Sequence, residues 1–227
     1  MPGAPEECVR GYASQLLFMI LLPRLYAIVD VSTDTGTDSL IAFADELTAA
    51  GCTFMQYRNK AGNARVMLAQ ARELRRNSRV GAPAPHIRLI MNDRADLCLA
   101  AGFDGVHVGQ DDLSPEEVRR IIGPERWLGV STHNPEQLRE ADMTSADYLA
   151  IGPVFATSSK ERPDPVVGLE GVRRARELTR KPLVAIGGIT RANAKSVIEA
   201  GADSVAVISD LLREPRKSAE EFFRILG

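Results

Sequence analysis

The segment L-V-A-I-G-G-I-T-R-A-N-A-K-S-V-I-E-A-G-A-D-S-V-A-V-I, residues 183–208, decides the fold. It contains two apolar runs, residues 183–186 and 204–208, which have the length and composition of strands buried on both faces. Between them lies a helical pattern, residues 192–200, which Gly201 terminates. A strand, a helix and a second buried strand in this order indicate a parallel βαβ unit.

The same pattern recurs along the rest of the chain. Strands are expected at residues 25–29, 53–58, 88–91, 105–108, 127–130, 147–151, 183–186 and 204–208. Helices are expected at residues 39–50, 64–77, 94–101, 115–122, 135–141, 169–179, 192–200 and 218–226. Ser114 and Glu117 have the spacing of a capping box, and Asn134 is the expected N-cap of the next helix.

About eight βα units with short connections predict the α/β class and a single closed (β/α)8 TIM barrel. An open doubly wound sheet is the alternative. That fold often carries a GxGxxG motif after its first strand, and this chain has none there.

Composition is that of an ordinary globular protein. Of the 227 residues, 44% are hydrophobic and 26% are charged, and the formal net charge is -2. Such a balance provides no general attraction for nucleic acids or anionic membranes, and we expect neither as a partner. Cys8, Cys52 and Cys98 form no C-x-x-C pair, so we expect reduced thiols in a cytoplasmic protein.

The N-terminal region differs from the rest of the chain. Residues 16–22 form an apolar run that is much shorter than the roughly 20 residues a membrane-spanning helix needs. We interpret residues 1–22 as an N-terminal extension and residues 23–227 as one TIM-barrel catalytic domain. A homo-oligomer is compatible with this organisation.

Polar residues gather where the expected strands end, and in a barrel of this type the active site lies at the carboxyl ends of the strands. The second strand ends with Gln56, Arg58 and Lys60, which share one face because strand side chains alternate. Cations that face inward need an anionic ligand or acidic neighbours. We therefore expect an anion-binding site beside Arg58 and Lys60.

The loop after the sixth strand has the composition of a phosphate site. Residues 151–160 read I-G-P-V-F-A-T-S-S-K, with hydroxyls at Thr157 and Ser159 and a cation at Lys160. Hydroxyl groups and a lysine suit phosphate oxygens. The alternative is a solvated loop with an ordinary surface lysine.

Two acidic residues follow neighbouring strands. Asp93 comes after the third strand and Asp112 after the fourth. Paired carboxylates near bound phosphates suit Mg²⁺, which prefers oxygen ligands and keeps waters and phosphates in its shell. The alternatives are a helix cap at Asp93 and a turn residue at Asp112. We expect a Mg²⁺ site opposite Arg58 and Lys60.

A second, metal-free anion site is expected after the last two strands. Gly187-Gly188 follows the seventh strand and Ser209 follows the eighth, where this fold habitually binds phosphate. His107 lies within the fourth strand and is expected to be an interior residue rather than a base. No Ser-His-Asp order is present. The pattern indicates a reaction between two phosphorylated small molecules, in which a metal-bound diphosphate can depart.

Taken in chain order, these motifs resemble one known family. They are Gln56-x-Arg58-x-Lys60, Asn92-Asp93-Arg94, Val106-His107-Val108-Gly109-Gln110-x-Asp112, Gly129-x-Ser131-Thr132, Gly152-Pro153-Val154-Phe155-x-Thr157-x-Ser159-Lys160 and Ala185-Ile186-Gly187-Gly188-Ile189. Their order over residues 25–212 is similar to that of the thiamine-phosphate synthases.

The resemblance implies a transferase of thiamine biosynthesis. It would condense 4-amino-2-methyl-5-hydroxymethylpyrimidine diphosphate with a thiazole phosphate by dissociative substitution, releasing diphosphate. The residues implied for the pyrimidine diphosphate are Gln56, Arg58, Lys60, Asn92 and Lys160. Those implied for the thiazole phosphate or the pyrimidine are Ser131, Thr157, Ser159, Gly188, Ile208 and Ser209. The implied catalytic residues are Arg58, Lys60, Ser131 and Lys160, with Asp93 and Asp112 as Mg²⁺ ligands.

The chain departs mildly from the family pattern. Ser159 stands where threonine is usual, and Asn59 stands where glutamate is common. Three other functions remain open: a thiazole tautomerase-like relative, a non-catalytic thiamine-phosphate-binding barrel, and another phosphate-binding barrel such as a sugar-phosphate isomerase. Asp93, Asp112 and Lys160 favour the synthase, because none of these alternatives needs both a metal and a diphosphate site.

Overall fold

Strands and helices alternate along residues 21–31, 36–78, 86–157 and 164–227, which are the residues that the computed structural model describes. The strands are β1 (Leu25–Val31), β2 (Phe54–Asn59), β3 (Arg88–Asn92), β4 (Gly105–Val108), β5 (Trp127–Thr132), β6 (Tyr148–Ile151), β7 (Leu183–Ile186) and β8 (Ser204–Val207). The helices are α1 (Thr37–Ala49), α2 (Ala64–Asn77), α3 (Ala95–Ala101), α4 (Pro115–Ile122), α5 (Pro135–Asp142), α6 (Gly168–Leu178), α7 (Ala194–Glu199) and α8 (Pro215–Leu226), with a 3-10 turn η1 (Ser209–Leu211) before α8.

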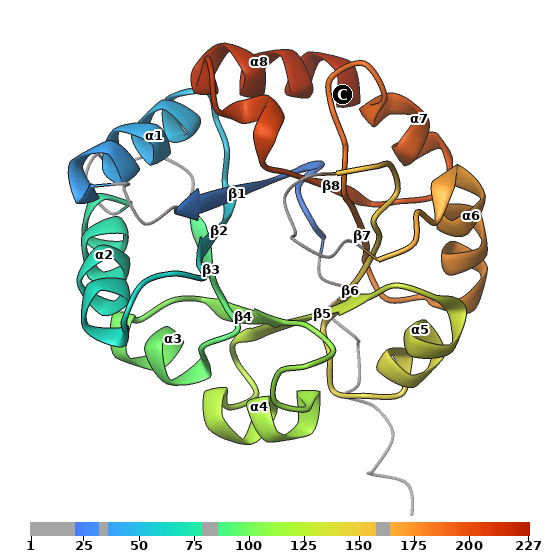
Figure 1. Ribbon diagram of the computed structural model, residues 1–227, viewed down its shortest axis with the longest axis horizontal. Coiled ribbons are helices and arrows are strands. Elements are labelled where there is room, and N and C mark those ends of the chain that lie inside the picture. The colour runs from blue at the N-terminus through green and yellow to red at the C-terminus, as the bar shows by residue number, and fades with distance from the viewer. Residues whose placement is uncertain (1–20, 32–35, 79–85, 158–163) are drawn as a thin grey trace, which may run out of the picture.

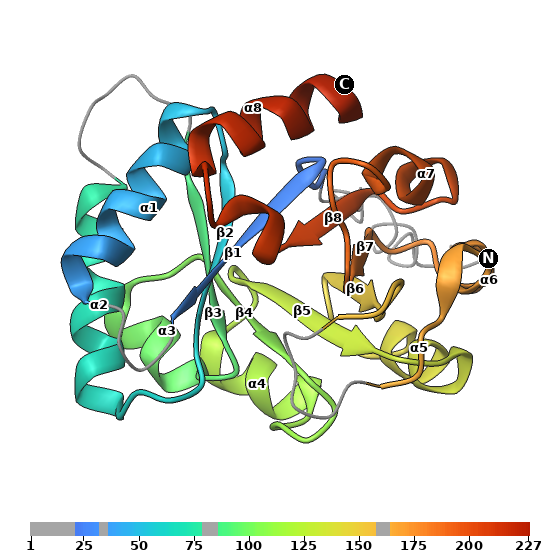
Figure 2. The same cartoon turned by 45° about the horizontal axis from the view of Figure 1, so that its top comes forward.

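The strands form a closed parallel barrel, which confirms the predicted fold. Each strand pairs with the next in sequence, and β8 pairs with β1 through Val205 opposite Leu25. Figure 1 looks into the barrel and shows the helices in a ring outside the strands. Figure 2 shows the strands running obliquely across the barrel inside that ring. Because helices cover the outer face and side chains fill the inner one, the strands read as continuous apolar runs.

Two hydrophobic clusters correspond to the two faces of the barrel. The outer cluster joins strand side chains such as Val29 and Val205 to the apolar sides of the helices. The inner cluster contains aromatic residues, among them Tyr26, Phe54 and Tyr148. Leu22, which we placed at the end of the extension, is 5% exposed and packs in this inner cluster. Residues 1–20 of the extension lie outside the described residues.

The predicted caps are confirmed, and a few element ends differ from expectation. Ser114 and Glu117 form the capping box of α4, and the Asn134 side chain caps α5. Helix α8 starts three residues earlier than expected, with Pro215 in its first turn, a position that proline favours. Helix α7 starts two residues later than expected, because Asn193 accepts a hydrogen bond from the Thr190 N–H and holds a turn there.

One arrangement occurs three times at the amino end of the barrel. An aspartate just before an even-numbered strand accepts hydrogen bonds from a helix arginine and from a backbone N–H of the preceding strand. These floor pairs are Arg75–Asp104 (2.5 Å), Arg119–Asp147 (2.6 Å) and Arg176–Asp203 (2.8 Å), and the N–H donors belong to Leu89, Leu128 and Leu183. Each floor pair joins one helix to the two strands that follow it, and charged hydrogen bonds of this kind are among the stronger ones.

Two further expectations concern the cysteines and the membrane. Cys52 and Cys98 are buried free thiols, whereas Cys8 lies outside the described residues. Within the described ranges, no helix combines the length and the apolar character that crossing a membrane requires.

Candidate active site

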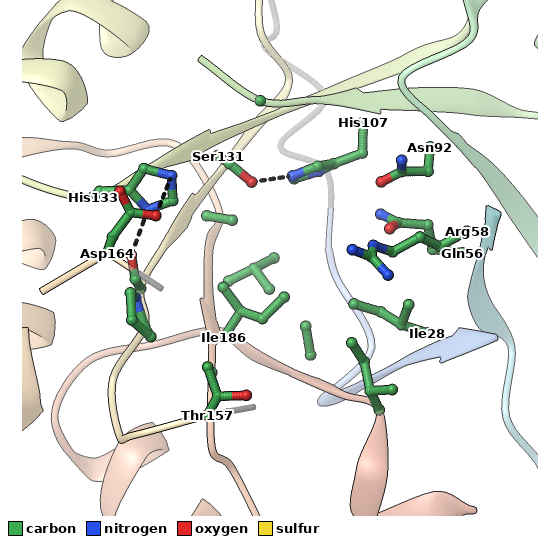
Figure 3. Close-up of a pocket in the computed structure, with 18 of the residues that line it drawn as sticks. Ile28, Gln56, Arg58, Asn92, His107, Ser131, His133, Thr157, Asp164 and Ile186 are labelled. Atoms are coloured by element: carbon green, nitrogen blue, oxygen red, sulfur yellow. Dashed lines mark hydrogen bonds and ion pairs between the residues drawn. The ribbon is translucent and has the colours of Figure 1, made fainter. Parts of the chain in front are cut away.

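A cavity of about 860 Å³ opens at the carboxyl ends of the barrel strands. Figure 3 shows Gln56, Arg58 and Asn92 on one wall, with His133 and Thr157 across the cavity from them. Every predicted site residue within the described ranges lines this cavity. These residues are Gln56, Arg58, Lys60, Asn92, Asp93, Asp112, Ser131, Thr157, Gly188, Ile208 and Ser209. The two remaining predicted residues, Ser159 and Lys160, lie outside the described residues.

Arg58 in β2 and Lys60 just after it line the cavity and have acidic neighbours. Arg58 Nη1 lies 2.5 Å from Asp30 Oδ1, and Lys60 Nζ lies 2.6 Å from Asp93 Oδ2. Asp30 is the penultimate residue of the neighbouring strand β1 and stands opposite Arg58 in the β1–β2 register. These ion pairs satisfy the inward-facing charges while leaving other N–H groups of both cations available to an anion. The sequence interpretation missed Asp30, although its place near the end of β1 was a usable signal.

Asp93 occupies an unusual backbone position. Its φ is 60°, which is uncommon for a residue other than glycine, although aspartate tolerates this region better than most residues. The N-cap of α3 is Arg94, so Asp93 is not the helix cap that we considered as an alternative. The turn directs the Asp93 carboxylate to Lys60 and into the cavity. Backbone conformations of this kind persist where the surroundings enforce them, often at functional sites.

Asp112 lies close to Asp93. Its Oδ2 accepts a hydrogen bond of 2.8 Å from the Gly109 N–H. Asp112 is therefore also the turn residue that we considered as an alternative to a metal ligand. Burial raises the pKa of the Asp112 carboxyl, the Gly109 N–H opposes that rise, and the adjacent Asp93 carboxyl raises the pKa further. Two carboxylates that repel one another in this way form a site at which a cation is favourable.

No cluster of three or more His, Cys, Asp or Glu side chains suited to a metal occurs among the described residues. Asp93 and Asp112 are therefore a two-carboxylate site, which is too small to enclose an ion by itself. Mg²⁺ is commonly held by one or two carboxylates and completes its shell with waters and substrate phosphates. The oxygen donors of this pair fit that ion.

The loops after β7 and β8 both line the cavity. Gly187 and Gly188 have φ values of 98° and 62°, and a Cβ on Gly188 would stand 2.5 Å from the Ala156 carbonyl oxygen. Only glycine fits here, because the loop after β7 packs directly on the loop after β6. Ser209 begins the η1 turn, which follows the adjacent strand β8. The Arg191 N–H and Nε donate to Asp210 Oδ2, at 2.8 and 3.0 Å, and so join the loop after β7 to the η1 turn.

The loop after β6 is anchored by a residue to which the sequence interpretation gave no role. His133 Nδ1 donates a hydrogen bond of 2.6 Å to the carbonyl oxygen of Gly152, and its Nε2 lies 3.5 Å from Asp164 Oδ2. Gly152 and Pro153 are joined by a cis peptide bond. Thr157 marks the point beyond which residues 158–163 lie outside the described residues. His133 thus connects the end of β5 to both sides of that loop.

His107 is an interior residue, as predicted. It is 8% exposed, and desolvation by burial lowers its pKa to about 4, so the imidazole is neutral near neutral pH. Its Nε2 lies 2.8 Å from Ser131 Oγ, and its Nδ1 lies 3.1 Å from the Tyr148 hydroxyl. Figure 3 shows the contact between His107 and Ser131 at the edge of the cavity. His107 thereby supports a predicted site residue without itself being exposed.

Comparison with known proteins agrees on one family. The sequence model of the family described as thiamine monophosphate synthase matches residues 25–211. A thiamine-phosphate synthase of Koribacter versatilis is 62% identical over 208 residues, which are 90% of this chain and 96% of that protein. A thiamine-phosphate synthase of Chloroflexus aurantiacus is 44% identical over 82% of this chain and 83% of its own length. The solved thiamine phosphate pyrophosphorylase of Pyrococcus furiosus superposes with a TM-score of 0.77 at 33% identity, over 89% of this chain and 95% of that one.

Proposed function

The chain belongs to the thiamine monophosphate synthase family, and from this membership we propose the reaction and the roles of its site residues. The protein is a transferase that forms thiamine phosphate. The proposed substrates are 4-amino-2-methyl-5-hydroxymethylpyrimidine diphosphate and a thiazole phosphate. The observation that carries the assignment of roles is that all predicted site residues in the described ranges line a single cavity.

The diphosphate of the pyrimidine substrate is assigned to the wall formed by β2 and β3. Arg58 and Lys60 are held ready by Asp30 and Asp93, so little side-chain ordering is needed when the anion arrives. Asn92 stands beside them and can donate a hydrogen bond from its amide. Lys160 is proposed to join this group from the loop after β6.

Asp93 and Asp112 are proposed to hold Mg²⁺. The ion, when bound, neutralises the diphosphate oxygens and so makes the diphosphate a better leaving group. The Asp93 carboxylate that now contacts Lys60 would turn to the metal, which frees the lysine ammonium for the diphosphate. Lys60 would thereby exchange its ion pair with Asp93 for a contact to the diphosphate.

The proposed reaction is a substitution at the methylene carbon of the pyrimidine. The bond between that carbon and the diphosphate oxygen breaks, and its electron pair leaves with the diphosphate. The aminopyrimidine ring delocalises the positive charge until the thiazole nitrogen supplies the electron pair of the new C–N bond. No protein nucleophile takes part, so the chain contributes charge stabilisation by Arg58, Lys60 and Lys160 and the alignment of the two substrates.

The thiazole phosphate is assigned to the loops after β7 and β8. Gly188 and Ser209 come close enough to the ligand space that backbone N–H groups and a hydroxyl can hold a phosphate there. Thr157, Ser159 and Ile208 are proposed to complete that side of the cavity. Holding the phosphate fixes the direction from which the thiazole nitrogen approaches.

Diphosphate release by the purified protein tests this proposal. Release is expected to require both substrates and to rise with Mg²⁺ concentration. Asp93→Asn should lower the rate at least about a hundredfold at limiting Mg²⁺ and shift half-activation to a higher metal concentration, because removing one transition-state charge contact commonly costs that much. Asp96→Asn is the matched control, since Asp96 lies three residues away and pairs with Arg94 rather than lining the cavity.

The outcomes separate the parts of the proposal. Equal effects of Asp93→Asn and Asp96→Asn on the Mg²⁺ response would remove the metal assignment. Release that needs no thiazole phosphate would overturn the proposed requirement for both substrates. A folded protein that releases no diphosphate at all would overturn the proposed reaction while the barrel and its cavity stand.

We also propose a cytoplasmic location for this reaction. Cys52 and Cys98 are free thiols, as expected where the environment is reducing. Fractionation of the source cells with an antibody against the protein tests this location, and recovery in an oxidising compartment would contradict it.

A further inference from the structure

A continuous chain of side-chain hydrogen bonds crosses the interior of the barrel below the cavity. Gln56 Nε2 donates to the Tyr26 hydroxyl at 2.8 Å, and the hydroxyls of Tyr26 and Tyr148 are 3.1 Å apart. The Tyr148 hydroxyl lies 3.1 Å from His107 Nδ1, and His107 Nε2 lies 2.8 Å from Ser131 Oγ. These five residues, which we call the inner relay, come from five different strands and connect Gln56 to Ser131. All of them except Tyr148 line the cavity.

The interior of the barrel is shaped to admit this relay. Tyr26 and Tyr148 are 1% and 0% exposed, and both belong to the inner hydrophobic cluster. Beside them Gly129 in β5 lacks the side chain that would block the relay. A Cβ there would stand 2.2 Å from Tyr148 Cζ and 2.4 Å from His107 Nδ1. Glycine at this position is therefore required by the hydrogen bond between Tyr148 and His107.

Because the two tyrosines of the relay are buried, each of their hydroxyl hydrogens needs an acceptor within the relay, and this requirement fixes the direction of each hydrogen bond. The amide nitrogen of Gln56 can only donate, so the Tyr26 oxygen accepts from it. The single hydroxyl hydrogen of Tyr26 then goes to Tyr148, and that of Tyr148 goes to His107 Nδ1. The opposite direction would leave a buried hydroxyl hydrogen on Tyr26 without an acceptor in the relay, which is costly.

The end of the relay follows from the state of the histidine. Nδ1 accepts the Tyr148 hydroxyl hydrogen and so carries none of its own, which makes the imidazole neutral, with one ring nitrogen accepting and the other donating. Because Nδ1 accepts from Tyr148, the hydrogen lies on Nε2 and is donated to Ser131 Oγ. The Ser131 oxygen is thus engaged as an acceptor, and its own hydrogen remains to be donated on the cavity side.

We propose that the inner relay fixes Ser131 as a hydrogen-bond donor to an oxygen or nitrogen acceptor on the substrate, and that Tyr26, Tyr148 and His107 are positioning residues for that donor. The identity of the substrate rests on the proposed function, whereas the direction of the hydrogen bonds does not. A hydroxyl whose orientation is set in advance costs no reorganisation when negative charge develops on the substrate. A free serine hydroxyl would instead rotate among its rotamers.

The tautomer of His107 tests the direction without any substrate. The chain has three histidines, so a long-range ¹H–¹⁵N spectrum of the labelled protein holds three imidazole patterns, and His107→Gln and His86→Gln assign them. His107 is expected to carry its hydrogen on Nε2. His133 is expected to carry it on Nδ1, because Nδ1 donates to the Gly152 carbonyl. The two histidines are therefore an internal contrast, and a His107 with its hydrogen on Nδ1 overturns the proposal.

Turnover measurements test the consequence for Ser131. Tyr148→Phe removes both hydrogen bonds that the Tyr148 hydroxyl makes in the relay, to Tyr26 and to His107. It should lower kcat about tenfold while KM for each substrate stays within about twofold, a loss of about 1.4 kcal/mol in the transition state. Tyr57→Phe is the matched control. Tyr57 is an equally buried tyrosine of β2, but its hydroxyl donates to Gln70 outside the barrel interior. It should leave kcat within about twofold.

A double-mutant cycle shows whether the effect passes through Ser131. In a Ser131→Ala background, Tyr148→Phe should cause no further loss of kcat, because the donor that the relay orients is already absent. Additive losses from the two changes would overturn the proposal. If the wild-type protein forms no thiamine phosphate, the proposed function fails, and the His107 tautomer still decides the direction of the relay.

Discussion

Buried His107 should make the stability of the protein depend on pH. The folded-state pKa of about 4 is lower than the ordinary value of 6.5, so the unfolded chain binds more protons than the folded one between those values. The free energy of unfolding therefore rises with pH across that window and is lost as the solution is acidified from about pH 6.5 toward pH 4. The free energy of unfolding falls on acidification because the imidazole must lose its proton in order to be buried.

The size of the effect follows from the same two values. At about pH 5 the unfolded imidazole is almost fully protonated, whereas only about a tenth of the folded imidazole is protonated. Integrating this difference from about pH 7 to pH 5 gives a loss of about 2 kcal/mol in the free energy of unfolding. A loss of this size is a substantial part of the 5 to 15 kcal/mol that is usual for a domain.

Urea denaturation at both pH values measures this loss. His107→Gln replaces the imidazole with a neutral amide that does not titrate, so the variant should lose about 2 kcal/mol less than the wild type between about pH 7 and pH 5. His86→Gln is the control, because the His86 side chain is 65% exposed and lies away from the barrel interior. Equal pH dependence of the wild type and His107→Gln would refute the reasoning, whatever the absolute stability of the variant.

Three further changes should alter stability in ways that urea denaturation measures. Gly129→Ala introduces a Cβ into the inner relay and should cost about 3 kcal/mol. Gly36→Ala, whose new carbon has no atom of the described residues within 4 Å, should cost under about 1 kcal/mol, and similar losses for the two variants would show that the barrel interior accommodates the new Cβ without strain. Asp104→Asn leaves the buried guanidinium of Arg75 without its ionic partner and should cost about 3 kcal/mol, and a loss under about 1 kcal/mol would mean that the floor pair contributes little. Ser114→Ala removes the capping box of α4 and should cost about 1 kcal/mol, an expectation that an unchanged denaturation midpoint would contradict.

The fold could be predicted because its signals are local. Apolar runs, caps and terminating glycines mark each unit separately, and all the predicted strands and helices are present with ends displaced by a few residues. Pro215 shows the kind of signal that was underused, since a proline favours the first turn of a helix over its interior. The closure of the barrel then follows from the number of units and the short connections between them.

The site was predictable in its members but not in its internal contacts. Alternation within β2 correctly placed Gln56, Arg58 and Lys60 on one face, because that argument needs only one strand. The inner relay was missed, since Tyr26 and Tyr148 are 122 residues apart and meet only when the barrel closes with a particular register. A sequence read one strand at a time contains no information on register. Hydrogen bonds between strands are therefore the part of the site that needed the structure.

The three floor pairs determine where the chain can accept insertions, loop exchange and new termini. They bind α2 to β4, α4 to β6 and α6 to β8 into three successive segments, and the joints between and beside these segments are the loops that carry Lys60, Asp112, Thr157 and Ser209. New chain termini opened at residue 113 would leave every floor pair within a continuous segment, whereas termini opened at residue 124 would separate Arg119 from Asp147. Loop insertion, exchange between relatives and circular permutation should thus be tolerated best at these four loops, each of which carries a proposed site residue. Changes in these loops can alter the chemistry of the site while the three segments joined by the floor pairs stay unchanged.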